Sequence, residues 1–226
     1  MRPFSSHRYH DFFKEIYPPA LKLATIASSF NQTERESFVR LWMTEGIPFA
    51  FKECPFVFES LRAWFGDNLG INPKEITIAG SGRIGYSLSG WPKYGRIFGS
   101  ESDLDLMAVS RTLYSELVEE FIGWKQDYND GTVAPRNDRE ARLWMDNFTK
   151  VPKIIDRGFV DAWKLPNLYP VTKNISNTLW LLIEKLKVTE GAPIIKDASI
   201  RVYRDWNAAL RQMTLNFRAA IRSVEN

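Results

Sequence analysis

The fold is decided by two stretches of the chain, ITIAGSGRIG at residues 76–85 and SDLDL at residues 102–106. The first begins with three β-branched residues, which predict a short strand over 75–79. Gly80 and Ser81 follow this strand directly as a turn. Glycine lets the backbone approach a ligand closely, and consecutive N–H groups in such a turn form an anion-binding nest. We therefore expect a phosphate to bind at this turn.

The second stretch carries two carboxylates in a pattern typical of a strand. Apolar residues alternate with Asp103 and Asp105, which predicts a strand over 103–110. Side chains two positions apart on a strand share a face, so both carboxylates project together while Leu104 and Leu106 point into the core. Two carboxylates on one face repel each other unless a cation lies between them, and carboxylate ligands suit Mg²⁺ or Mn²⁺. The two stretches together predict a site for a nucleotide and a metal ion.

The glycine spacing has a second interpretation. Gly80, Gly82 and Gly85 satisfy the letters of the dinucleotide-binding motif G-x-G-x-x-G. That motif requires a helix to open directly after the turn. Residues 86–100 instead read as a loop rich in glycine, proline and aromatic residues. We therefore expect a phosphate-binding turn without a following helix.

Composition excludes several other classes of site. A chain of 226 residues fits one large domain or a core with a modest satellite lobe. The net charge of +3 is too small to indicate a nucleic-acid-binding protein by itself. Cys54 is the only cysteine, and His7 and His10 are the only histidines, which argues against a disulfide, a zinc site or a Ser-His-Asp triad. No secretory signal or membrane-spanning stretch is evident, so we expect a cytoplasmic protein without a membrane partner.

The remaining patterns predict an α+β fold, with a small mixed sheet flanked by N-terminal and C-terminal helices. Thr33 and Glu36 form a capping box for a helix that Gly46 would end. Further elements are expected as helices at 55–70, 113–124, 139–148, 175–188 and 206–221 and a strand at 194–203, whereas 151–170 stays undecided. We divide the chain into an N-terminal helical region (1–70), a core (71–165) and C-terminal helices with a strand that closes the core (166–226).

The pairing of the two motifs resembles the signature of the DNA polymerase β-type nucleotidyltransferase superfamily. The likeness covers about 35 residues, 76–110. The superfamily includes cyclic-oligonucleotide synthases, CCA-adding enzymes, aminoglycoside nucleotidyltransferases and toxin-type minimal enzymes. The resemblance implies that Gly80 and Ser81 contact the triphosphate of a nucleotide. It also implies that Asp103 and Asp105 are catalytic ligands for one or two Mg²⁺ ions.

Two features depart from the superfamily's pattern. The spacer between the two motifs is longer than usual, so residues 86–100 look like an inserted loop. The family commonly uses a third carboxylate on a later strand. Asp197 is our first candidate because its strand is the clearer one, and Asp156 and Asp161 are the alternatives in the undecided region.

Several polar side chains are candidates for contacts to the nucleotide. Arg83, Lys93 and Arg96 lie between the motifs and could neutralise phosphate charge, although solvated loop cations are an equal alternative for each. Ser102 directly precedes the acidic pair. A separate basic stripe is expected on the C-terminal helix, where a solvated surface is favoured over contacts to triphosphate, RNA or an acidic partner. Its members are Arg204, Arg211, Arg218 and Arg222.

The function expected from these features is transfer of a nucleoside monophosphate from a nucleoside triphosphate to a hydroxyl acceptor. The acceptor could be a nucleotide, RNA, a protein or a small molecule. In the two-metal mechanism, one ion activates the acceptor hydroxyl and the other stabilises the pyrophosphate leaving group. Resemblance to compact superfamily members suggests a defence or toxin-type role. The alternatives are an inactive nucleotide-binding module and a glycosyltransferase that uses Asp-x-Asp to hold manganese and a nucleotide sugar.

Overall fold

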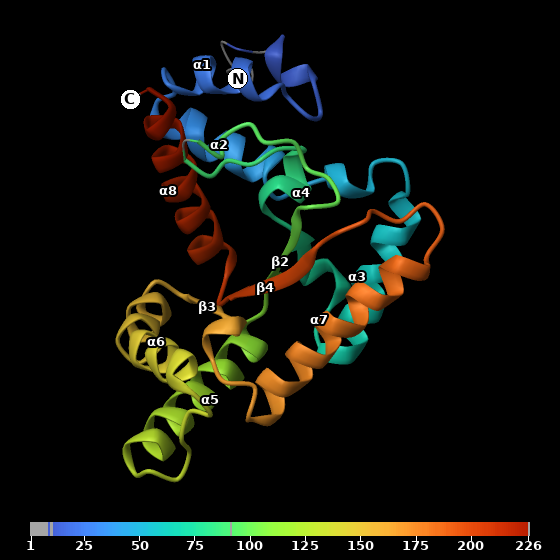
Figure 1. Ribbon diagram of the computed structural model, residues 1–226. Helices are drawn as coiled ribbons and strands as arrows, with labels where there is room; N and C mark the ends of the chain where they lie inside the picture. Colours follow the sequence, from blue (N-terminus) through green and yellow to red (C-terminus); the bar gives the residue numbers. More distant parts are fainter. Residues whose placement is uncertain (1–8, 10, 91, 226) are drawn as a thin grey trace, which may run out of the picture.

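The protein folds around a mixed sheet (Figure 1), shown in a computed structural model that describes residues 9, 11–90 and 92–225. Its strands are β1 (Ile76–Ile78), β2 (Asp103–Val109), β3 (Phe159–Asp161) and β4 (Asp197–Tyr203). They lie in the order β1-β2-β4-β3. β2 and β4 run parallel in the centre, while β1 and β3 pair antiparallel to them at the edges. The predicted α+β class with a small mixed sheet is confirmed.

Helices surround this sheet on both faces. They are α1 (Ala20–Ala27), α2 (Gln32–Trp42), α3 (Pro55–Leu69), α4 (Gly80–Ile84), α5 (Arg111–Asn129), α6 (Asp138–Asp156), α7 (Pro170–Val188) and α8 (Trp206–Glu225). Short 3-10 turns join them at η1 (Phe12–Lys14), η2 (Phe49–Phe51), η3 (Pro73–Glu75) and η4 (Ala162–Lys164). α2 packs against α8 on one side of the sheet, and α3 packs against α7 on the other side (Figure 1).

One face of the sheet is entirely apolar and forms the main core. Leu104 and Leu106 are fully buried there, as their alternation with the aspartates predicts. They pack with Ile200 of the neighbouring strand and with apolar side chains of α3, α5 and α7. Each fully buried leucine contributes about 1.5–3 kcal/mol to folding. This burial fixes the register of β2, because a slip by one residue would drive both aspartates into the core.

The opposite face is divided between an apolar half and a polar half. Met107 and Val109 lie near the carboxyl end of β2 and pack with Met213 and Phe217 of α8. Towards the amino end of the same strand the face carries aspartates, and α8 does not cover it. α8 therefore covers the half of this face near the carboxyl end of β2 and leaves the half near its amino end open.

The helix over 55–70 begins and ends as the sequence predicts. α3 has Pro55 at its first position and Gly70 as its C-cap in the left-handed conformation (φ 65°). The predicted capping box at Thr33 and Glu36 is wrong. Asn31 and Glu34 form the box instead: the Glu34 N–H donates to Asn31 Oδ1 at 2.9 Å, and the Asn31 N–H donates to Glu34 Oε2 at 2.8 Å.

The region after β1 also differs from the prediction. A one-turn helix, α4, opens directly at Gly80 where we expected a turn without a helix. It ends after Ile84 because Gly85 adopts a left-handed conformation (φ 95°). Since α4 has five residues, it lacks the long helix of a dinucleotide-binding βαβ unit.

The undecided region 151–170 contains β3, an edge strand of the sheet. α6 extends through it to Asp156 with Pro152 inside, and β3 follows after Gly158. β3 has three residues, all of them buried, and pairs with β4 so that Asp161 lies opposite Arg201.

Candidate functional site

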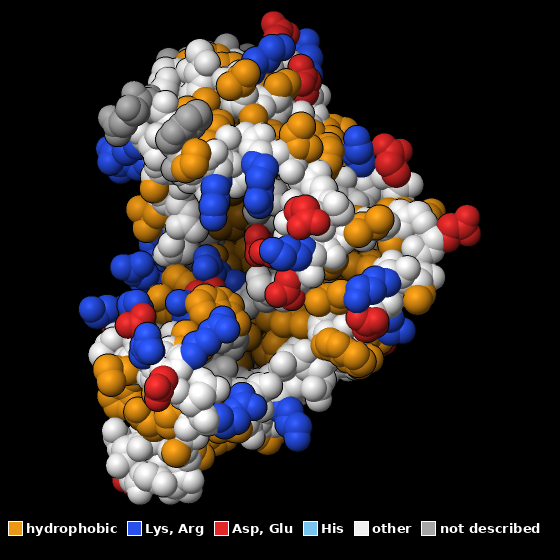
Figure 2. Space-filling view, in the orientation of Figure 1, with side chains coloured by type: hydrophobic (Ala, Val, Ile, Leu, Met, Phe, Trp, Pro, Cys, Tyr) orange, Lys and Arg blue, Asp and Glu red, His pale blue; other side chains and the backbone are white. Residues whose placement is uncertain are grey.

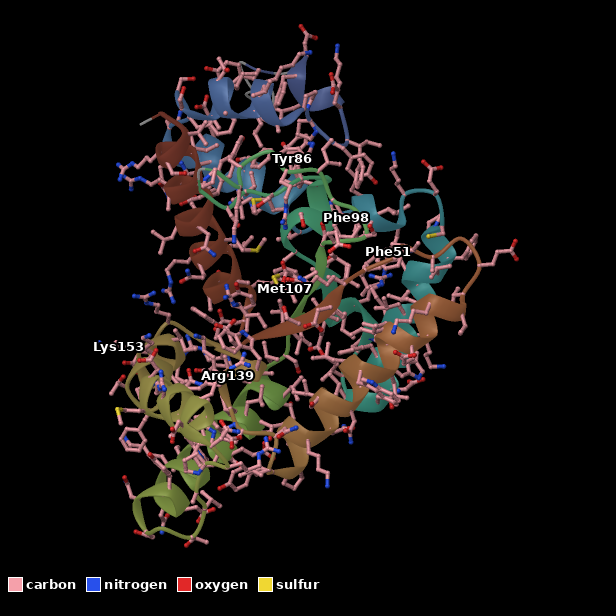
Figure 3. All side chains as sticks on the ribbon, viewed as in Figure 1. Phe51, Tyr86, Phe98, Met107, Arg139 and Lys153 are labelled. Carbon is pink, nitrogen blue, oxygen red and sulfur yellow. The ribbon has the colours of Figure 1, made fainter. Side chains whose placement is uncertain are left out.

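A cleft of about 780 Å³ lies over the open half of the sheet. Its walls are α8, α4 and the loop that connects α4 to β2. In Figure 3, Met107 lies on β2 below the loop that carries Tyr86 and Phe98, and Arg139 and Lys153 lie on α6 beyond the sheet. Figure 2 shows this hollow with acidic side chains beside it and with lysine or arginine side chains near its rim.

Asp103 and Asp105 project into the cleft from β2. The Ser199 hydroxyl of β4 donates a hydrogen bond to Asp105 Oδ1 at 2.9 Å. No lysine or arginine among residues 9, 11–90 and 92–225 forms an ion pair with either aspartate. Burial raises the pKa of Asp105; the Ser199 hydrogen bond opposes this shift, and the charge of Asp103 adds to it. The charge of Arg201 also opposes the shift. Because neither aspartate has an ion-pair partner among the described residues, a bound cation would stabilise the pair.

Gly80 and Ser81 line the same cleft, directly beside this pair. The Ala79 N–H donates to the Asp105 carbonyl oxygen at 2.7 Å, which joins the end of β1 to the acidic strand. Gly80 has a φ of 60°, and a Cβ on it would lie 2.6 Å from Asp105 Oδ2. Only glycine fits this position without displacing the carboxylate. The structure thus brings together the two motifs that the sequence paired.

A third carboxylate, Asp161, lines the cleft from β3. It is 6% exposed and accepts a hydrogen bond from Arg201 Nε at 2.6 Å. The Arg201 guanidinium also lies over the Phe159 ring, 4.8 Å from its centroid. Asp161 was one of the two alternative candidates, whereas we did not single out Arg201. The signal available for Arg201 was its place on the predicted strand, two residues after Ser199 and thus on the same face.

The other two candidate carboxylates lie outside the cleft. Asp197 is the register partner of Asp103, yet it is exposed and its carboxylate accepts a hydrogen bond from the Ala198 N–H at 2.8 Å. It borders a neighbouring groove instead. Asp156 is exposed at the end of α6. Of the three candidates, the structure brings Asp161 to the acidic pair's cleft, and our first choice, Asp197, does not line it.

Of the basic residues proposed to contact the nucleotide, two line the cleft and one does not. Lys93 and Arg96 line the cleft. Arg83 is buried and points elsewhere: its Nε donates to the Trp42 carbonyl at 2.9 Å and its Nη1 to the Gly46 carbonyl at 2.8 Å. Burial lowers the pKa of Arg83 to about 10. Arg83 thus binds the carbonyls at the end of α2 rather than lying in the cleft.

Ser102 is buried and does not line the cleft either. Its hydroxyl accepts a hydrogen bond from the Gly99 N–H at 3.1 Å, and its carbonyl accepts one from the Lys196 N–H at 2.9 Å. The residue therefore fixes the loop ahead of β2 instead of facing a ligand.

The basic stripe lies on the outer side of α8 and the residues before it. Arg204 pairs with Asp205 at 3.0 Å, and Arg211 Nη2 donates to the Arg157 carbonyl at 3.1 Å. Burial, and then the charges of Arg218 and Arg222, lower the pKa of Arg35 on α2. None of the four arginines of the stripe lines the cleft.

Among the described residues that line the cleft, those of the metal-binding types His, Cys, Asp and Glu are all aspartates. Within the described part of the chain, no group of three or more His, Cys, Asp and Glu side chains is placed to hold a metal ion. Asp161 lines the same cleft as Asp103 and Asp105, and its carboxylate accepts a hydrogen bond from Arg201. His7 and His10 lie outside the described residues.

No helix in the described ranges is both long enough and apolar enough to cross a membrane.

Comparison of the chain with protein-family models, with curated proteins and with solved structures finds no match.

Proposed function

We propose that the protein is a metal-dependent nucleotidyltransferase that transfers a nucleoside monophosphate to a hydroxyl acceptor. One observation carries the proposal. Asp103 and Asp105 share a cleft with Gly80 and form no ion pair with a described lysine or arginine, and Asp105 leaves no room for a side chain at the glycine. Asp105 is half-buried without an ion pair to a described residue, which costs stability unless a cation binds beside it.

The residues present fit a magnesium or manganese ion. Asp103 and Asp105 offer the hard oxygen ligands that these ions prefer, with Ser199 orienting one of the carboxylates. A bound divalent cation would supply charge stabilisation for the transferring phosphoryl group and activation of the acceptor hydroxyl. The backbone at Gly80 and Ser81 would position the triphosphate. Lys93 and Arg96 would neutralise part of its charge.

Asp161 would serve as the third acid of the proposed enzyme only when it is released from Arg201. In the structure the Arg201 guanidinium donates a hydrogen bond to the Asp161 carboxylate. A triphosphate that drew Arg201 towards itself would free Asp161 to serve as the third acid. If Arg201 stays on Asp161, the cleft holds only two available carboxylates, which favours the second candidate function, a nucleotide-binding module without turnover.

Pyrophosphate release separates the two functions. The full chain is incubated with each labelled nucleoside triphosphate and Mg²⁺ or Mn²⁺, alone and with candidate acceptors. We expect pyrophosphate and a labelled acceptor product from the wild type and none from Asp103→Ala. Asp156→Ala is the matched control, since it removes an exposed aspartate outside the cleft. Metal-dependent nucleotide binding without pyrophosphate would establish the binding module instead.

A further inference from the structure

A second hollow, the groove, lies between α6, η4, α7 and β4 and has a volume of about 440 Å³. Most of the side chains that line it are apolar. Three of them are large and well exposed: Trp180 at 62%, Trp163 at 59% and Leu143 at 41%. Figure 2 shows hydrophobic side chains lining a hollow in the region where Figure 1 draws α6 and α7. A pocket of this size with a few polar groups is typical of a small-molecule site.

The groove adjoins the cleft. Trp163 and Ser199 line both hollows. Ser199 is the residue whose hydroxyl donates to Asp105. A ligand in the groove would therefore lie next to Ser199, the hydrogen-bond partner of Asp105. This is the place from which an acceptor hydroxyl would approach a nucleotide held at Gly80.

The charges of the groove favour a largely uncharged ligand. Among the described residues that line it, Lys164 is the sole cation, and its ammonium lies over the Trp163 ring, 4.4 Å from the centroid. Glu140 pairs with Arg136, and Asp197 lies at the edge. A polyphosphate would meet little positive charge here. Two exposed indoles, by contrast, offer flat faces on which a planar ring can stack.

Polar groups suited to the edge of a planar ring also line the groove. Asn147 is buried, and its Nδ2 donates to the Lys164 carbonyl at 2.7 Å, which fixes the amide in place. Asn167 and Ser176 add further donors and acceptors. Amide and hydroxyl side chains of this kind read the hydrogen-bonding edge of an unstacked nucleobase.

From these features, and resting on the proposed function, we infer that the groove is the acceptor site and that it binds a nucleoside, with the base on Trp163 and Trp180 and a ribose hydroxyl directed at the cleft. In the reaction, the hydroxyl oxygen forms a bond to the α-phosphorus of the nucleoside triphosphate. The bond from that phosphorus to the bridging oxygen breaks, and pyrophosphate leaves with the electron pair. The hydroxyl proton passes to solvent. A free nucleotide and the 3′ end of an RNA share this chemistry.

Binding measured without catalysis tests the inference. Adenosine, guanosine, cytidine and uridine, and a short single-stranded RNA with a free 3′ hydroxyl, are titrated calorimetrically into the full chain without metal or triphosphate. We expect at least one of these probes to bind. Trp163→Ala and Trp180→Ala should each weaken it about tenfold or more, since base stacking on an aromatic side chain contributes this much. Trp206→Ala is the matched control because Trp206 is 44% exposed and lines neither the groove nor the cleft.

The outcomes separate this inference from the proposed function. Loss of nucleoside binding in the two tryptophan variants, with Asp103→Ala still binding, supports the groove even if the wild type releases no pyrophosphate. Tighter binding of the RNA than of any nucleoside identifies the 3′ end of an RNA as the source of the acceptor hydroxyl. Absence of binding by every probe, or equal binding by the wild type and both tryptophan variants, overturns the inference. Binding of N-acetyltyrosinamide in place of the nucleosides overturns it as well and indicates a protein acceptor.

Discussion

The α-carbon of Gly80 lies so close to the Asp105 carboxylate that a Cβ at this position would be 2.6 Å from Oδ2. This contact joins the Gly80-Ser81 motif to the acidic motif. The backbone bond from the Ala79 N–H to the Asp105 carbonyl, at 2.7 Å, holds the two segments in that arrangement. The geometry explains why α4 starts with glycine: the left-handed φ of 60° and the close approach both exclude a side chain.

Substitution of Gly80 should therefore damage both stability and the site. For Gly80→Ala we expect the free energy of unfolding to fall by about 1–3 kcal/mol, because a non-glycine residue at positive φ is strained and the methyl group displaces Asp105. Mg²⁺-dependent nucleotide binding should be lost. Urea denaturation and calorimetric titration measure the two effects. Gly123→Ala in α5, where a Cβ meets nothing within 4 Å, is the control and should gain about 0.5–1 kcal/mol.

The raised pKa of Asp105 predicts how the effect of Asp105→Asn on stability changes with pH. Since burial raises the pKa above that of the unfolded chain, the contribution of this group is fully present below the unfolded pKa and is lost as pH rises through the folded pKa. Asp105→Asn should therefore raise the melting temperature of the metal-free protein more at pH 8 than at pH 4. An equal shift at both values would contradict this account.

The proposed metal site predicts that metal binding depends on pH. A carboxylate must lose its proton to bind a divalent cation. The stabilisation of the wild type by Mg²⁺ should grow as pH rises from 5 to 8, and Asp105→Asn should show no such gain. Thermal melts with and without Mg²⁺ measure this, with Asp156→Asn as a control that keeps the wild-type response. A metal response in Asp105→Asn equal to that of the wild type would place the ion elsewhere.

Sequence patterns predicted the parts of the site that local chemistry determines. The alternation in β2 and the position of Gly80 after β1 are encoded within a few residues, and both were found as predicted. The α3 boundaries were equally local, since Pro55 and Gly70 carry the signals for a helix start and end. Boundary errors arose where two capping patterns competed within three residues, at Asn31 and Thr33.

The parts that sequence patterns left open depend on contacts between distant segments. β3 has three residues, too few to show a period, and its pairing partner lies 40 residues further along the chain. The choice between Asp161 and Asp197 therefore needed the strand order. Arg83 is a similar case, because the carbonyls that it binds come from positions 37 and 41 residues earlier.

One contact outside the site caps the amino end of a helix with a carboxylate from another helix. Glu120 on α5 accepts hydrogen bonds from the N–H groups of Val171 at 2.5 Å and Thr172 at 2.9 Å, in the first turn of α7. These N–H groups have no partner within the helix, and the negative charge also suits its amino end. Glu120→Ala should lower the free energy of unfolding by about 1–2 kcal/mol in urea denaturation. Glu119→Ala, on the exposed side of α5, should stay within about 0.5 kcal/mol of the wild type.

The bond between Arg201 and Asp161 should behave as a coupled pair. Arg201→Met leaves the Asp161 carboxylate buried without a partner, so we expect a loss of about 2–4 kcal/mol, at the lower end because Arg201 is itself 34% exposed. Asp161→Asn should cost less, since an amide needs no counter-charge. In the double variant much of the Arg201→Met loss should be recovered, and a double-mutant cycle in urea measures that coupling. Strict additivity of the two losses would show that the pair contributes no coupling. Pyrophosphate release then assigns the role: loss in the well-folded Asp161→Asn variant identifies Asp161 as the third acid, and unchanged release limits it to holding Arg201.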